Sequence, residues 1–133
     1  MIDRIDNELR VMQTALSVRS YRQELLASNI ANADTPHYKA RDVEFRSALA
    51  GALGAPGGAL PMANTAPAHL QGLAANPLGA PLLYRTEQQS AVDGNTVNMD
   101  VERSAFADNA LNVEALLTFV RGSLKDLNTA ITG

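Results

Sequence analysis

Residues 106–131 have the sequence FADNALNVEALLTFVRGSLKDLNTAI, which holds the most regular pattern in the chain. Its apolar side chains recur at alternating intervals of four and three residues, the heptad spacing of a helix that packs along one face. The members of this stripe are Phe106, Ala110, Val113, Leu117, Val120, Leu124, Leu127 and Ile131. Asn98 has the side chain of a helix N-cap, with Asp100 and Glu102 in the first turn, so the pattern predicts one long C-terminal helix.

A second long helix is predicted at the N-terminus. Its apolar stripe has the same spacing and is interrupted by one polar turn that contains Arg19 and Gln23. Pro36 disfavours helical backbone at Thr35, so this helix should end near Ala33. The apolar members of the stripe are Ile2, Ile5, Leu9, Met12, Leu16, Leu26, Ile30 and Ala33.

The N-terminal helix also carries apolar side chains outside that stripe. Val18, Tyr21 and Leu25 have no obvious partner elsewhere in the chain, and the polar turn suits a simple two-helix core poorly. We therefore expect one face of this helix to pack inward and another to pack against neighbouring subunits. Two helices alone also bury little apolar surface, which favours association with other chains.

The middle of the chain has a different composition. Residues 47–84 contain no charged side chain, and residues 51–81 hold six of the nine Gly and five of the six Pro. This composition predicts a flexible, partly disordered connection, followed by short extended pieces between residues 82 and 97. The predicted fold is all-α, with the two long helices paired as an antiparallel coiled coil in one domain formed by residues 1–46 and 85–133.

Composition excludes several classes of function. The 133 residues carry a net charge of −3 and no basic patch, which argues against nucleic-acid binding. Cys is absent, so disulfides, thiol catalysis and Cys-ligated metals are excluded. No apolar run approaches the roughly 20 residues of a bilayer span, and the acidic N-terminus differs from a secretory signal, so we expect neither membrane insertion nor a cleaved leader.

The sequence offers no recognisable enzyme site. His37 and His69 are the two histidines, and neither has neighbours at the spacing of a metal site or a catalytic triad. The segment from Asp93 resembles a calcium loop, but its sixth position is Asn98 rather than Gly and its twelfth is Ser104 rather than Glu. We therefore predict no catalytic, metal or cofactor residues, and interpret this segment as a turn before a helix cap.

The segment NIANADTPHYK, residues 29–39, resembles the signature near the N-terminus of bacterial flagellar rod and hook proteins. It departs at His37, where the family usually has Gly, which adopts positive φ more readily. Residues 40–45 and 93–102 are similar to the proximal-rod members of that family. The matching motif residues are Asn29, Ile30, Ala31, Asn32, Thr35, Pro36, Tyr38 and Lys39.

The resemblance implies a structural subunit rather than an enzyme. Members of the family are exported through the flagellar type III apparatus without a cleaved signal, and polymerise through their terminal helices into the periplasmic rod of the motor drive shaft. Expected partners are further copies of the chain, other rod proteins of the FlgC type, the adaptor FliE and the export gate, and no cofactor is expected. The expected interface residues are Ile5, Leu9, Met12, Leu16, Leu26, Ile30, Phe106, Val113, Leu117, Val120, Leu124, Leu127 and Ile131.

Three alternatives are compatible with the same patterns. One is a sibling rod protein such as FlgC, and another is a secreted helical adaptor that never polymerises. The third is an enzyme that acts on peptidoglycan, since a rod must cross the cell wall. An enzyme needs a catalytic Asp or Glu in a cleft, and the sequence predicts no cleft-forming fold.

Overall fold

The computed structural model describes residues 2–54, 82–86 and 92–133, which contain three helices and two short strands. The elements in chain order are α1 (Ile2–Ala31), β1 (Arg41–Val43), α2 (Phe45–Gly54), β2 (Leu82–Tyr84) and α3 (Met99–Thr132). The prediction of two long terminal helices is therefore confirmed. The all-α class is correct only in the coarser sense of a mostly helical fold, because a small sheet accompanies the helices.

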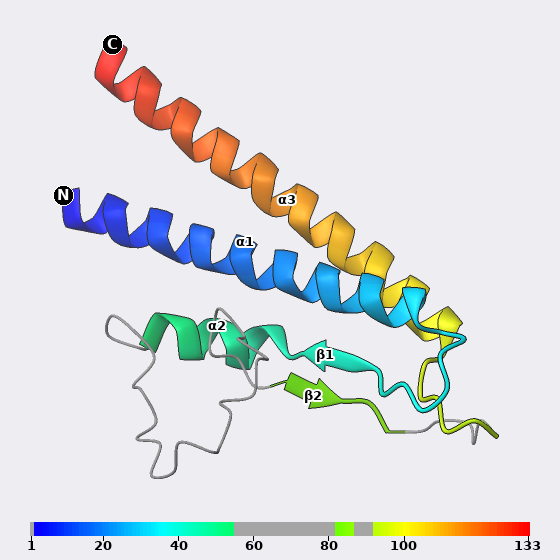
Figure 1. Ribbon diagram of the computed structural model, residues 1–133. Helices are drawn as coiled ribbons and strands as arrows, with labels where there is room; N and C mark the ends of the chain where they lie inside the picture. The colour runs from blue at the N-terminus through cyan, green and yellow to red at the C-terminus, as the bar shows by residue number, and fades with distance from the viewer. Residues whose placement is uncertain (1, 55–81, 87–91) are drawn as a thin grey trace, which may run out of the picture.

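The two long helices lie side by side and run in opposite directions (Figure 1). They are close where α1 ends and α3 begins, and they diverge toward the chain termini, which lie at the same end of the molecule. The helix α2 and the two strands lie along the other side of α1. The first helix is thus covered on two faces, by α3 on one and by α2 and the sheet on the other.

Local sequence accounts for where the helices begin and end. The Asn98 side chain accepts hydrogen bonds from the backbone N–H groups of Asp100 and Val101, which confirms it as the N-cap of α3. The helix α1 ends at Ala31, close to the predicted end at Ala33. Beyond it, the N–H of Thr35 donates to the carbonyl of Asn32, which closes a turn before Pro36.

The strands β1 and β2 pair antiparallel, with Arg41 opposite Tyr84 and Val43 opposite Leu82. The strand β2 falls in the region where short extended pieces were predicted, whereas β1 was not predicted at all. Each strand has only three residues, too few for the alternation of apolar and polar side chains to be recognised. The pairing joins β1 to the last three residues of the charge-free tract.

The helix α2 corrects the predicted flexible connection at its start. The expectation that the Gly- and Pro-rich tract forms no helix is wrong for residues 51–54, since α2 continues to Gly54. Its first turn is capped by Glu44, whose carboxylate accepts from the N–H groups of Arg46 and Ser47. The remainder of the tract, residues 55–81, lies outside the described residues.

The hydrophobic core lies between α1, α2 and the sheet. Val18, Leu25, Val43 and Ala48 are buried together, and Tyr21, Phe45 and Leu82 pack against them. The expectation that Val18, Tyr21 and Leu25 lack a partner within the chain is therefore wrong. These side chains face α2 and β1, which the sequence patterns did not reveal.

Candidate functional site

Asn29, in the motif that resembles the flagellar signature, joins three elements at the end of α1. Its side chain is fully buried. The amide oxygen accepts from the N–H of Arg41 at 3.0 Å, and the amide nitrogen donates to the carbonyl of Arg41 at 2.7 Å. The same nitrogen donates to Glu102 Oε2 at 3.0 Å. One side chain thus ties α1 to the first residue of β1 and to the first turns of α3.

Asn95, in the second motif segment, caps the turn that follows α1. Its Nδ2 lies 3.1 Å from the carbonyl oxygen of Asn32 and 2.8 Å from those of Ala33 and Thr35. Its Oδ1 accepts from the N–H of Val97 at 2.7 Å. These carbonyls belong to the turn that follows α1, so the buried amide caps this turn rather than the last carbonyls of the helix.

The turn at His37, inside the motif segment 29–39, has a backbone conformation that favours glycine. His37 has φ of +61°, in the left-handed region, and its N–H donates to the carbonyl of Asp93 at 3.0 Å. A histidine therefore occupies a turn position whose backbone conformation Gly adopts more readily. Gly94 has φ of +73°, and a Cβ atom at this position would lie 2.9 Å from His37 Nδ1. Any residue larger than Gly at position 94 would therefore require the His37 side chain to move.

Tyr38 packs back onto α1. Its hydroxyl lies 3.1 Å from the hydroxyl of Ser28 and donates to Asn29 Oδ1 at 3.3 Å. Its carbonyl accepts from the N–H of Thr96, and Thr96 Oγ1 accepts from the N–H of Ala40 at 2.8 Å. We call the cluster of Asn29, Tyr38, Asn95, Thr96 and Glu102 the junction, because it joins the two motif segments.

A group of four charged side chains connects the junction to the sheet. Asp42 accepts from Arg22 at 2.8 and 3.0 Å and from Arg85 at 2.8 Å. Arg85 Nε also lies 3.3 Å from Glu102 Oε1, and the Glu102 side chain is fully buried. Two guanidinium groups thus balance two carboxylates, which is what burial of charge requires.

The pKa of Asp42 reflects this environment. Burial penalises its charged form, but hydrogen bonds from Arg22 and from the N–H of Val43, together with the charges of Arg22 and Arg85, outweigh that penalty. The net result is a pKa of Asp42 below the ordinary value of 3.8. The hydrogen bond to Asp42 correspondingly raises the pKa of Arg22, so both groups keep their charges at neutral pH.

The polar turn of α1 meets a polar residue on α3. Asn109 is fully buried, donates to Gln23 Oε1 at 2.6 Å and to the carbonyl of Arg19 at 2.9 Å, and accepts from Arg19 Nη1 at 3.3 Å. The guanidinium of Arg19 lies 3.8 Å from the ring centroid of Phe45, so it also covers the core. The polar turn that interrupts the N-terminal stripe therefore finds its hydrogen-bonding partner, Asn109, within the same chain.

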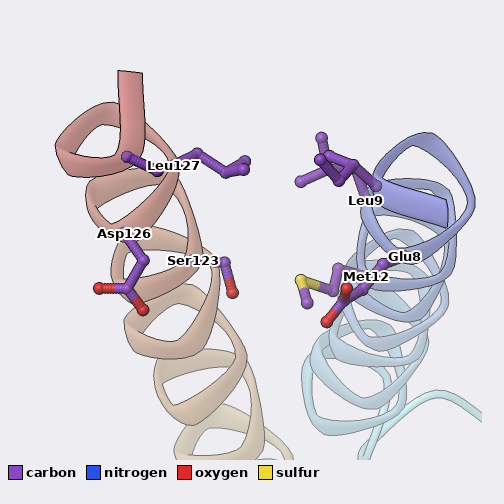
Figure 2. A pocket seen from close by; sticks show the side chains of 8 residues that line it. Glu8, Leu9, Met12, Ser123, Asp126 and Leu127 are labelled. Atoms are coloured by element: carbon purple, nitrogen blue, oxygen red, sulfur yellow. The ribbon is translucent and has the colours of Figure 1, made fainter. Parts of the chain in front are cut away.

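The predicted interface residues are buried to very different extents. Met12 and Leu26 are buried, whereas Leu124 and Ile131 are 51% and 84% exposed. The others are partly buried: Ile5, Leu9, Leu16, Ile30, Phe106, Val113, Leu117, Val120 and Leu127. Near the termini, Ile5, Leu9 and Met12 face Leu127 across a groove of about 290 Å³ (Figure 2).

The predicted motif residues occupy the junction and its surface. Asn29 is buried, and Tyr38, Ile30 and Asn32 are partly buried. Lys39 is exposed, with its Nζ 3.0 Å from the carbonyl of Gly94. The remaining exposed motif residues are Ala31, Thr35 and Pro36.

Known proteins resemble this chain over nearly its whole length. A family model described as "Flagella basal body rod protein" matches residues 9–39, which span most of α1 and the following turn. The chain is 44% identical to the flagellar basal body rod protein FlgB of Proteus mirabilis, over 96% of this chain and 95% of that protein. This chain belongs to the FlgB family of flagellar basal body rod proteins. It is also 43% identical to FlgB of Salmonella typhimurium, over 100% of this chain and 99% of the relative. FlgB of Escherichia coli is 43% identical over 96% of this chain and 94% of that protein.

Membership of the FlgB family makes the chain a component of the flagellar basal body rod. The names of the relatives describe a rod protein, which agrees with the expectation of a structural subunit. In residues 2–54, 82–86 and 92–133, no group of His, Asp and Glu side chains is arranged to hold a metal ion. His69 lies outside the described residues. Within those same ranges, each helix is too short or too polar to span a bilayer.

Sequence reasoning missed several polar residues that organise this member of the FlgB family. Asp42, Arg85, Glu102 and Asn109 were not proposed as site residues, and Asn95 was interpreted only as part of a turn. Asn109 had a recognisable signal, because the polar turn at Arg19 and Gln23 needs a polar partner in an antiparallel neighbour. The partners of Glu102 had none, since Asn29 is 73 residues away in sequence.

Proposed function

We propose that this chain is a structural subunit of the proximal rod, exported by the flagellar type III apparatus and polymerised through its terminal helices. In the assembled state, α1 and α3 pair as an antiparallel coiled coil, and neighbouring subunits cover their remaining apolar faces. The two ends of the chain then act as one structural domain in the periplasmic rod. Further copies of the chain, FlgC-type rod proteins, FliE and the export gate are the proposed neighbours.

The observation that carries this proposal is the apolar side of α3 that holds Leu124 and Ile131, which are seven residues apart and 51% and 84% exposed. Leu111 and Phe119, on other sides of the same helix, are 71% and 60% exposed. Complete burial of a large apolar side chain stabilises by about 1.5–3 kcal/mol, so four such residues on one helix favour association strongly. Because association stabilises the folded state by mass action, polymerisation would also order the terminal helices.

The proposal predicts that a charge on this surface blocks incorporation into the rod without unfolding the subunit. Leu124→Asp places a carboxylate at a half-exposed position, where it costs the single subunit little but would be buried without a partner in a rod. We expect loss of motility and no variant in purified basal bodies, with an unchanged helical circular dichroism spectrum. Thr118→Asp, at an exposed position of the same helix, is the matched control.

Two results would contradict the proposal. Normal motility and normal incorporation of Leu124→Asp would show that this part of α3 is not an assembly surface. Purified wild-type chain that forms neither rings nor filaments at any concentration, and that is missing from basal bodies, would instead favour a secreted adaptor.

A further inference from the structure

The terminal halves of α1 and α3 enclose a groove that the residues described by the structure leave unfilled. It has a volume of about 290 Å³ and lies between residues 5–12 of α1 and residues 123–130 of α3. Ile5, Leu9, Met12, Leu127 and Ala130 give it an apolar lining. Figure 2 shows Leu9 and Met12 on one side and Leu127 on the other, directed toward the space between the helices.

Two carboxylates lie at the edge of this groove, one on each helix. Glu8 and Asp126 both contribute to its lining, and both are exposed (Figure 2). Within the described residues neither forms an ion pair. If the two helices closed on each other here, these like charges would approach, which opposes closure. A cation supplied from outside the subunit would relieve this repulsion.

Another face of α3 carries the complementary pattern. Leu117, Arg121 and Leu124 follow one another at intervals of four and three residues, so they share one side of the helix. Arg121 is exposed, and in the described part of the chain it has no ion-pair partner. We call these three residues the flank of α3. Since each helical residue advances by about 100°, Arg121 lies about 140° around the helix from Asp126, well away from the groove.

We propose that the groove of one copy of this chain binds the flank of α3 of a second copy. Leu117 and Leu124 would enter the apolar lining, and Arg121 would lie between the carboxylates of Glu8 and Asp126. The inference rests on the proposed function and specifies the surfaces by which copies associate. Because the groove and the flank are different surfaces, each copy can bind one neighbour through each. Such a head-to-tail contact continues into a ring or a helical filament.

Charge exchange tests the electrostatic part of the proposal. Glu8→Lys and Arg121→Glu each place like charges across the contact, and each should weaken the assembly of purified chain at least about tenfold, measured by sedimentation. The triple variant Glu8→Lys, Asp126→Lys and Arg121→Glu reverses every charge of the contact, so it should assemble close to the wild-type level. Two single variants that assemble normally, or a triple variant no better than Arg121→Glu, would overturn the proposal.

Disulfide cross-linking tests the contact directly, because the chain has no cysteine of its own. A copy carrying Met12→Cys and a copy carrying Leu124→Cys are mixed, assembled and oxidised, and a covalent dimer is expected. Thr118→Cys replaces Leu124→Cys in the control, since Thr118 is exposed on another part of α3, and this mixture should give no dimer. Equal yields from both mixtures would also contradict the proposal.

The same cross-link, made in the bacterium that encodes the chain, separates failure of this inference from failure of the proposed function. If the wild-type chain is present in basal bodies but the Met12–Leu124 dimer does not form, the groove binds another protein and only the inference fails. If the wild-type chain is missing from basal bodies, both fail. A dimer in purified basal bodies would support both.

Discussion

Among single residues, His37 holds the backbone conformation with the clearest energetic consequence. Its φ of +61° is unfavourable for a residue with a Cβ atom, by about 1 kcal/mol relative to Gly. The main-chain hydrogen bond from His37 to Asp93 requires this turn but no particular side chain. The position therefore tests how much this backbone conformation costs a residue that has a Cβ atom.

We predict that His37→Gly is more stable than His37→Ala by about 1 kcal/mol, although Gly is normally the less stable of the two because of its greater unfolded-state entropy. Both variants remove the imidazole, so their difference isolates the effect of the Cβ atom at positive φ. Urea unfolding followed by circular dichroism measures the free energy of unfolding of each. An alanine variant that equals the glycine variant would show that the turn relaxes away from this conformation.

Asn95 provides the second prediction at this scale. Asn95→Ala removes one donor from the carbonyls of Asn32, Ala33 and Thr35 in a largely buried place, although those of Asn32 and Thr35 keep a backbone N–H, so we expect a loss of about 1–3 kcal/mol in the free energy of unfolding. Asn112→Ala is the matched control. Asn112 also donates to a carbonyl, that of Asp108, but on the exposed side of α3, and its replacement should change stability by less than about 0.5 kcal/mol. Equal effects of the two substitutions would refute the capping role.

At the scale of elements, charged side chains hold the sheet against α1. Arg22 comes from the helix, Asp42 from β1, and Arg85 follows β2, so Asp42 lies between cations from two elements. The two strands have three residues each and, within the described residues, pair only with each other, so this two-stranded sheet would be marginal by itself. The charge cluster and the core residues Val43 and Leu82 therefore stabilise the sheet on α1.

The depressed pKa of Asp42 predicts a specific loss of stability in acid. Because its folded pKa lies below the ordinary 3.8, the carboxylate stabilises the fold above that pH, and the contribution is lost as the pH falls from about 3.8 through the lower folded value. Asp42→Asn should be less stable than the wild type at about pH 6, and the difference should shrink toward about pH 3. Unfolding free energies at both pH values give the comparison. A difference that is constant with pH would exclude this role for the charge.

The helices and strands differ in how well the sequence predicted them. The long helices α1 and α3 were predictable because their stripes repeat over many turns, and Asn98 has a recognisable capping pattern. The helix α2 was not, because ten residues rich in Ala and Gly lack a clear apolar period. Once α2 and β1 were missed, Val18 and Leu25 seemed to have no intramolecular partner.

In the candidate site, too, the sequence predicted some residues and missed others. The motif around Asn29 was visible as a local pattern, and the apolar interface residues followed from periodicity. The partners of that motif were not visible, since Asn95 and Glu102 reach it across a long stretch of chain and carry no periodic signal. Charged pairs such as Arg22 with Asp42 depend on the sheet position, which three-residue strands do not reveal.

At the scale of the whole molecule, the packed part lies at one end. The core, the charge cluster and the junction surround the carboxyl half of α1 and the first turns of α3. The buried residues of α3 are Glu102 and Asn109, and beyond them no described side chain of this helix is buried. Toward the termini the helices diverge around the groove (Figure 1). The fold therefore holds the two helices together at one end and leaves the other end for neighbours.

This asymmetry predicts a gradient of local stability along α3. Local opening requires less free energy where few side chains are buried, so backbone amides of residues 120–132 should exchange with deuterium at least about 100-fold faster than those of residues 102–110 in the isolated chain. Hydrogen exchange with mass spectrometry measures both segments in one experiment, and residues 22–29 of α1 serve as an internal standard for the packed end. In assembled rods the gradient should disappear, because neighbours would cover Leu124 and Ile131. Uniform protection of α3 in the isolated chain would mean that the terminal half is already stabilised within one subunit, and assembly would then not be needed to order it.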